Sequence, residues 1–169
     1  MRGMDGYGLK ICAFQAELFE RSLDRLECSS KIFIRRFMYS DLAARLDSNG
    51  FIYESGGIED AFDELDRQYG TTAYGRQRFG MEEMHWIGYI YRYWAYTYGD
   101  SSKHLFKFIK PEELCGLYFP YHSLDPAQAI ERILEAGGTE PGDQIARGVE
   151  IIRHIREKSG EKAFLTNPD

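Results

Sequence analysis

The sequence lacks any run of about twenty apolar residues, which is the length that a membrane-spanning helix requires. Its most apolar segment, residues 84–98, is interrupted by Arg92. The first ten residues contain three glycines, and they lack the uninterrupted apolar region of a secretory signal. We therefore expect a protein that has no membrane span and is not exported.

Cysteine is scarce, and the three cysteines, Cys12, Cys28 and Cys115, stand far apart. They are odd in number and form none of the CxxC or Cys/His patterns that zinc sites use. A reducing compartment fits best, so we expect a cytoplasmic protein. Cys12 and Cys115 have apolar neighbours, where a free cysteine packs as a small hydrophobic residue, so we expect core positions rather than redox or nucleophilic roles.

Recognisable cofactor motifs are also lacking. The glycine-containing segments 50–57 and 70–80 match neither a phosphate-binding loop nor a dinucleotide fingerprint. The paired carboxylates Glu82-Glu83 and Glu112-Glu113 stand at the beginnings of expected helices, where negative charge is stabilising without any chemistry. We therefore predict no catalytic residues, no cofactor and no metal site.

The chain does have enough apolar sequence for a full core, with 43% apolar and 15% aromatic residues in a length of 169. Its net charge of −6 is unevenly spread, because residues 70–110 hold six basic and three acidic side chains while both flanks are negative. Overall acidity disfavours general phosphate binding and favours a basic protein partner.

Apolar spacing and capping residues predict an all-α fold. We expect a single-domain multi-helix bundle over residues 1–137, with a helical appendage and tail over 138–169 and at most one short extended segment near 51–54. The expected helices, some with capping residues included, cover residues 8–28, 29–38, 41–46, 58–69, 81–98, 101–110, 111–117, 126–136 and 143–158.

The helix expected at 81–98 is the most aromatic segment and should lie at the centre of the bundle. One stripe of this helix has the spacing of a core-facing surface and consists of Met84, Ile87, Gly88, Tyr91, Trp94, Ala95 and Tyr98. A second stripe follows helical spacing along the opposite side and consists of His85, Tyr89, Arg92 and Tyr96.

Three interpretations of this second stripe stay open. Its tyrosines can be buried side chains with solvated tips around a paired arginine. The stripe can also be a partner-binding hot spot, in which Tyr and Arg are enriched, or a surface for base stacking. Arg92 needs a specific acceptor, which lies either within the chain or on a partner.

An aromatic, proline-containing connection is expected at residues 118–126, between two well-capped helices. It contains Tyr121 and His122, which we include with the stripe as candidate partner-binding residues. His122 has no serine, cysteine or metal partner at an interpretable spacing, so a packed or hydrogen-bonded loop histidine is favoured over a general base.

Arg78 and His85 raise an alternative function. Six residues separate them, a spacing that resembles the loose Arg/His pattern of helical ribonucleases in the HEPN superfamily. In such enzymes the pair would serve phosphodiester cleavage. Arg78 is expected to precede the central helix, so the two side chains need not share a face. We keep a helical nuclease or nucleic-acid-binding protein that uses the positive region 70–110 as the alternative function.

Several segments of the sequence carry a likeness to known bacterial proteins. These segments are 51–55, 86–93, 95–98, 101–102, 109–111, 117–118, 121–126 and 129–133. They resemble short helical bacterial proteins, among them antitoxin components of toxin–antitoxin loci, over residues 8–136. The resemblance implies a non-enzymatic protein-binding module that neutralises a cognate toxin, and it carries no catalytic residues over to this chain.

Overall fold

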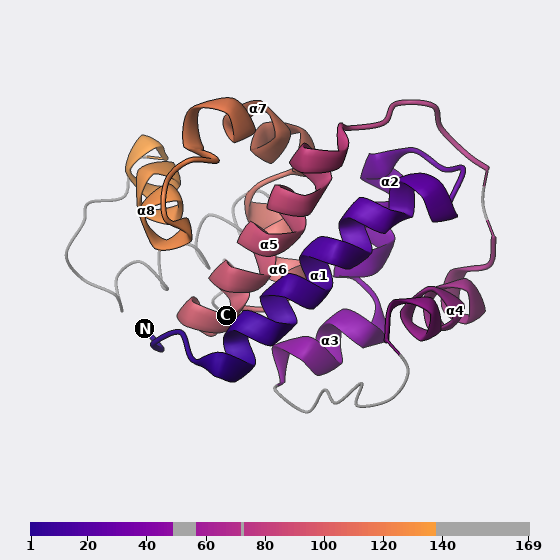
Figure 1. The fold of residues 1–169 in the computed structure, drawn as a ribbon, viewed down its shortest axis with the longest axis horizontal. Helices are drawn as coiled ribbons and strands as arrows, with labels where there is room; N and C mark the ends of the chain where they lie inside the picture. Colours follow the sequence, from indigo (N-terminus) through magenta and orange to yellow (C-terminus); the bar gives the residue numbers. More distant parts are fainter. Residues whose placement is uncertain (49–56, 72, 138–169) are drawn as a thin grey trace, which may run out of the picture.

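The computed structural model describes residues 1–48, 57–71 and 73–137. Within these ranges the chain forms eight α-helices and no strand (Figure 1). The prediction of an all-α bundle is confirmed for this part of the chain. The extended segment predicted near 51–54, the helix predicted at 143–158 and the rest of the appendage 138–169 lie outside the described residues.

The observed helices follow the predicted order. Most boundaries agree with the predicted ones to within about three residues, and α7 is the exception. The helices are α1 (Gly6–Arg25), α2 (Ser30–Met38), α3 (Asp41–Asp47), α4 (Gly57–Tyr69), α5 (Met81–Tyr98), α6 (Ser102–Phe108), α7 (Pro111–Tyr121) and α8 (Pro126–Ala136).

Side-chain caps explain where several of these helices begin. Ser29, Ser40, Ser101 and Asp125 each accept a hydrogen bond from a backbone N–H of the first turn that follows. At the other end of α5, Gly99 adopts a φ of 68° that an L side chain would disfavour, and the helix ends there. The side-chain contacts satisfy backbone donors that the beginning of a helix leaves open.

The helix α7 corrects one prediction. Residues 118–126 were expected to form a connection after a helix that ends at Leu117, but α7 continues to Tyr121 with Pro120 inside it. Proline removes one backbone hydrogen bond to the residue four positions earlier. That residue is Gly116, which is exposed to solvent, so its carbonyl group can bind water. Tyr118 packs its ring edge-on against Trp86, which holds the added turn against α5.

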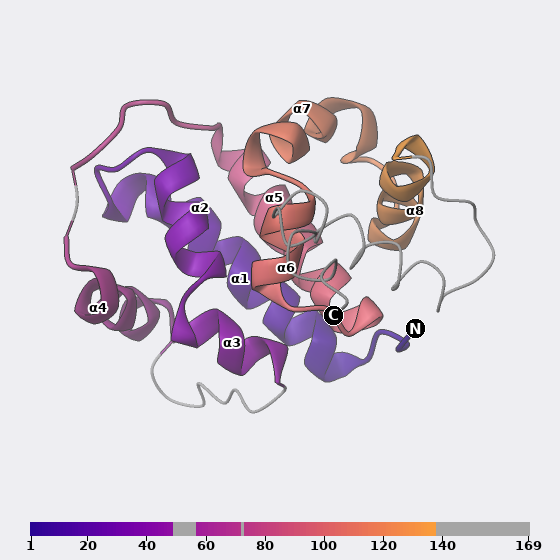
Figure 2. The same ribbon diagram turned by 180° about the vertical axis from the view of Figure 1, so that it is seen from behind.

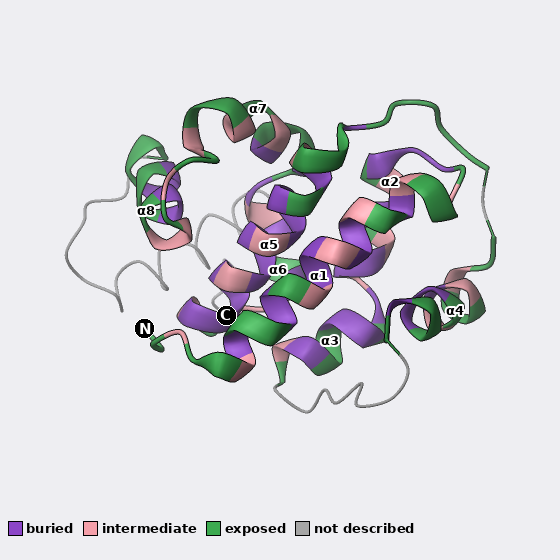
Figure 3. Ribbon diagram, viewed as in Figure 1, coloured by how far each residue is buried: buried purple, intermediate pink, exposed green. Residues whose placement is uncertain are grey.

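Helices α1 and α5 run antiparallel through the centre and make the most extensive helix–helix contact (Figure 1). In Figures 1 and 2, α2, α3 and α4 lie on one side of this pair, and α7 and α8 lie on the other. Helix α6 packs against both α5 and α2. Figure 3 shows buried positions concentrated where α5 faces its neighbours.

The predicted core face of α5 is confirmed. Met84, Ile87, Tyr91 and Trp94 are completely buried, and the hydroxyl group of Tyr91 donates a hydrogen bond to the backbone oxygen of Ile109 at 2.6 Å. Gly88 sets the distance between the two central helices. A Cβ atom at Gly88 would lie 2.8 Å from the backbone oxygen of Gln15, closer than side-chain carbons normally approach.

A buried arginine links four helices at the middle of the bundle. Arg92 of α5 is 1% exposed, and its Nε donates to Gln15 Oε1 of α1 at 2.7 Å. Its Nη1 and Nη2 atoms donate to Asp47 Oδ1 of α3 and to Ser102 Oγ of α6, each at 2.7 Å. Ser102 also donates its backbone N–H to Asp47 Oδ2 at 2.9 Å. The acceptor that the sequence required for Arg92 therefore lies within the chain.

The first prediction concerns this network. Arg92→Ala should lower the free energy of unfolding by about 3–5 kcal/mol, because it leaves the Asp47 carboxylate without its buried partner. The matched control is Arg132→Ala, which removes an exposed arginine from α8 and should change stability by less than about 0.5 kcal/mol. Urea unfolding followed by circular dichroism measures both. Equal losses for the two variants would contradict a structural role of Arg92.

The second prediction compares two glycines within helices. Gly88→Ala should lower the free energy of unfolding by about 1–3 kcal/mol, because the added methyl group meets the backbone of α1. Gly116→Ala is the control, since a Cβ atom there meets nothing within 4 Å. It should raise stability by about 0.5–1 kcal/mol through helix propensity. A stabilising Gly88→Ala substitution would show that the contact between α1 and α5 is looser than described.

Candidate functional site

The structure brings three of the six candidate residues together in one surface groove. His85 and Tyr89 project from α5, and His122 follows the last turn of α7. We call this feature the α1–α5–α7 groove. It encloses about 470 Å³ and is lined by Glu20, Met81, Glu82, His85, Trp86, Tyr89, Tyr118 and His122.

Polar contacts fix several of the side chains in this groove. His85 Nδ1 pairs with Glu20 Oε2 of α1 at 2.8 Å. The hydroxyl group of Tyr118 donates to Glu82 Oε2 at 3.1 Å, and the ring of Tyr118 stacks on that of His122 with centroids 4.5 Å apart. Each histidine of the groove therefore contacts a side chain of a neighbouring residue.

The tyrosines of the groove stay protonated at neutral pH. Burial raises the pKa of Tyr89, and burial together with the hydrogen bond to Glu82 raises the pKa of Tyr118. The tyrosines are therefore uncharged, and their rings contribute apolar walls and π-faces. The carboxylates of Glu20 and Glu82 add acidic groups to the same groove. Such a surface is suited to hold a cationic or apolar side chain of a ligand.

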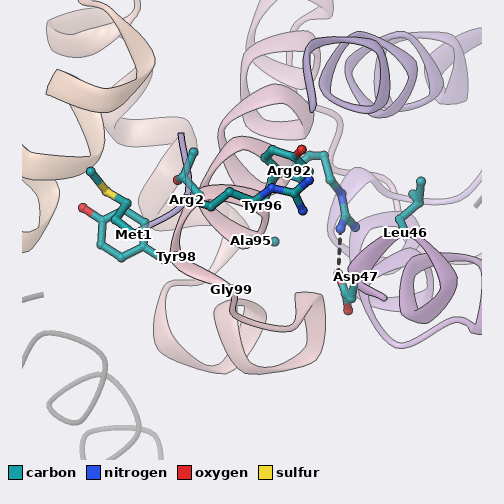
Figure 4. A pocket seen from close by; sticks show the side chains of 10 residues that line it. Met1, Arg2, Leu46, Asp47, Arg92, Ala95, Tyr96, Tyr98 and Gly99 are labelled. Carbon is teal, nitrogen blue, oxygen red and sulfur yellow. Dashed lines mark hydrogen bonds and ion pairs between the residues drawn. The ribbon is translucent and has the colours of Figure 1, made fainter. Parts of the chain in front are cut away.

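Arg92 and Tyr96 lie elsewhere, so the predicted stripe is not one continuous surface. Both residues border a second pocket of about 200 Å³ that also includes Asp47, and Figure 4 shows the Arg92–Asp47 ion pair beside it. Tyr96 is 6% exposed and donates its hydroxyl hydrogen to Asp5 Oδ1 at 2.7 Å. Burial and this hydrogen bond raise the pKa of Tyr96 to about 12.

The physical reason for this division is the packing of α1 against α5. Helix α1 covers the C-terminal half of the stripe, because Gly8 lies against Tyr96 and Gln15 bonds to Arg92. The other candidate residue, Tyr121, is half-buried at the end of α7 and packs against the core.

Several lining residues of the groove were not predicted from the sequence. Glu82 and Trp86 stand one helical turn from His85 and Tyr89, so helical spacing alone was a usable signal for them. Glu20 comes from another helix, and its place depends on the antiparallel register of α1 and α5. Tyr118 was assigned to a connection rather than to a helix.

No group of three or more histidine, cysteine or acidic side chains in residues 1–48, 57–71 and 73–137 is placed to hold a metal ion. Burial raises the pKa of Cys12 to about 12, and burial together with Glu83 does the same for Cys115, whose thiol donates to Glu83 at 3.2 Å. Neither thiol is an activated nucleophile.

The Arg78 and His85 pair is engaged in structural contacts. Arg78 lies in the segment before α5, and its guanidinium donates hydrogen bonds to the backbone oxygens of Leu23 and Leu26 at the end of α1. These bonds satisfy carbonyl groups that the end of a helix leaves open. His85 pairs with Glu20 instead, so the two residues of the ribonuclease-like spacing have separate partners.

None of the helices in the described part of the chain combines the length and the hydropathy needed to cross a bilayer. Comparisons of the chain with models of protein families, with curated proteins and with solved structures gave no match.

Proposed function

We propose that this chain is a non-enzymatic, cytoplasmic protein-binding module and that its partner docks in the α1–α5–α7 groove. The proposal rests on one observation, which is that two large exposed apolar side chains lie at this groove. Met81 lines the groove and is 57% exposed, while Phe119 is 84% exposed beside His122. Exposed apolar side chains grouped around a pocket are typical of binding surfaces.

The chemistry of the groove selects a basic segment of the partner. Glu20 and Glu82 supply carboxylates, and the rings of Tyr89 and Tyr118 supply faces that attract an ammonium or guanidinium group. The net charge of −6 adds long-range attraction for a basic protein. The resemblance to antitoxin components makes a cognate toxin the first candidate for this partner.

The alternative function, a helical nuclease or nucleic-acid-binding protein, has weaker support. Two of the basic residues in region 70–110 are engaged within the fold, because Arg92 is buried and Arg78 binds carbonyl groups of α1. The groove next to His85 carries carboxylates, which repel phosphates. Phosphate contacts dominate nucleic-acid affinity, so these features favour a protein partner.

The third prediction tests docking in the groove. A double variant, Met81→Ala with Phe119→Ala, should capture the partner from a lysate of the native host at least about tenfold less well than the parental chain, the scale of a lost binding contact. The matched control is Leu9→Ala with Tyr74→Ala, which removes two exposed apolar side chains outside the groove. It should capture the same protein at the parental level.

Quantitative mass spectrometry of the captured proteins gives the comparison, and thermal melting shows whether both double variants fold. If every captured protein binds the groove variant and the control equally, the partner does not dock in this groove.

The fourth prediction tests the alternative function, a helical nuclease. The purified chain should leave RNA intact, and His85→Ala should not relieve any growth defect that overexpression causes. Gel electrophoresis of incubated RNA measures the first result. Metal-independent cleavage that His85→Ala abolishes would favour the nuclease instead.

A further inference from the structure

A second groove of opposite charge lies where α2, α6 and the beginning of α7 meet. It encloses about 420 Å³ and is lined by Lys31, Ile32, Arg35, Tyr39, Phe106, Lys110, Pro111 and Glu112. We call it the basic groove. The side chains of Ile32, Tyr39, Phe106 and Pro111 give it apolar lining, and three cationic side chains border it.

Contacts with aromatic rings place two cations beside this lining. The Lys110 Nζ atom lies 4.4 Å from the centroid of the Phe106 ring. Lys103, an exposed residue of α6, lies over the Tyr39 ring at 5.3 Å. Arg35 is exposed, and its guanidinium makes no hydrogen bond or ion pair with the described part of the chain. Positive charge is therefore held on several sides of the groove.

A carboxylate of the chain itself pairs with one of the cations that line this groove. Lys31 Nζ pairs with Glu112 Oε1 at 2.7 Å. Burial acts to raise the pKa of Glu112, but the hydrogen bond from Lys31 and the charges of Lys31 and Lys110 outweigh it, so the pKa is lowered. Arg35 and Lys103 are placed to attract further carboxylates.

The aromatic rings favour an acidic peptide over a nucleic acid. Single-stranded nucleic acids bind by stacking bases on open ring faces. Phe106 is only 8% exposed, its ring lies 5.6 Å from that of Tyr39 in an edge-to-face contact, and each ring has a lysine over it. The net charge of −6 also repels a long polyanion more strongly than a short acidic segment, which carries fewer charges.

We propose that the basic groove is a second protein-docking site and binds an acidic segment that carries an apolar side chain. The apolar side chain of that segment contacts Ile32 and Pro111, and its carboxylates pair with Arg35 and Lys103. This site is separate from the α1–α5–α7 groove, and it stands whether or not a basic partner docks there.

Fluorescence anisotropy with three labelled probes tests this site. The first probe is a short peptide in which glutamates surround a leucine and a phenylalanine, the second has glutamine at every glutamate position, and the third is a short single-stranded RNA. We expect the glutamate peptide to bind at least about tenfold more tightly than either of the others.

Two charge reversals locate the binding. Arg35→Glu should weaken binding of the glutamate peptide at least about tenfold. Lys10→Glu makes the same change in net charge at an exposed position of α1 outside the groove, and it should leave binding near the parental value. Circular dichroism shows that both variants keep their helices. Tighter binding of RNA, no binding of the glutamate peptide, or equal losses in the two variants would each overturn the proposal.

Discussion

The arrangement of the central helices depends on the hydrogen bonds of the Arg92 guanidinium group. It is 1% exposed and bonds to Gln15, Asp47 and Ser102, so a single buried charge joins α1, α3, α5 and α6. A buried cation is costly unless all its donors find acceptors, and this requirement restricts how those helices can sit. The same register of α1 against α5 brings Glu20 to His85 at one end of the helix pair and thereby builds one wall of the α1–α5–α7 groove.

The two grooves have complementary chemistry. The α1–α5–α7 groove combines carboxylates with tyrosine rings and suits a cationic segment, whereas the basic groove combines lysines and an arginine with apolar lining. Helix α7 contributes to both, through Tyr118 at one end and Pro111 at the other. It packs on α5 and also contacts α2, so it lies between the two grooves.

Local sequence signals predicted the helices well, because caps such as Ser40 and Asp125 and the stop at Gly99 act within a few residues. The site was predicted only in part. Helical spacing placed His85, Tyr89, Arg92 and Tyr96 on one stripe, but the packing of α1 divides it into a groove and a buried region. Such packing depends on long-range register, which the spacing within one helix does not contain. The basic groove was not predicted for the same reason, since its cations come from α2, from α6 and from the residue before α7.

We propose that a protein partner occupies the α1–α5–α7 groove. Hydrogen–deuterium exchange of the full chain, measured alone and in complex with the partner captured from the native host, tests it most directly. We expect slower exchange on binding at residues 81–89 and 118–122, with little change in α4. Slower exchange confined to other parts of the chain, with residues 81–89 and 118–122 unchanged, would contradict it.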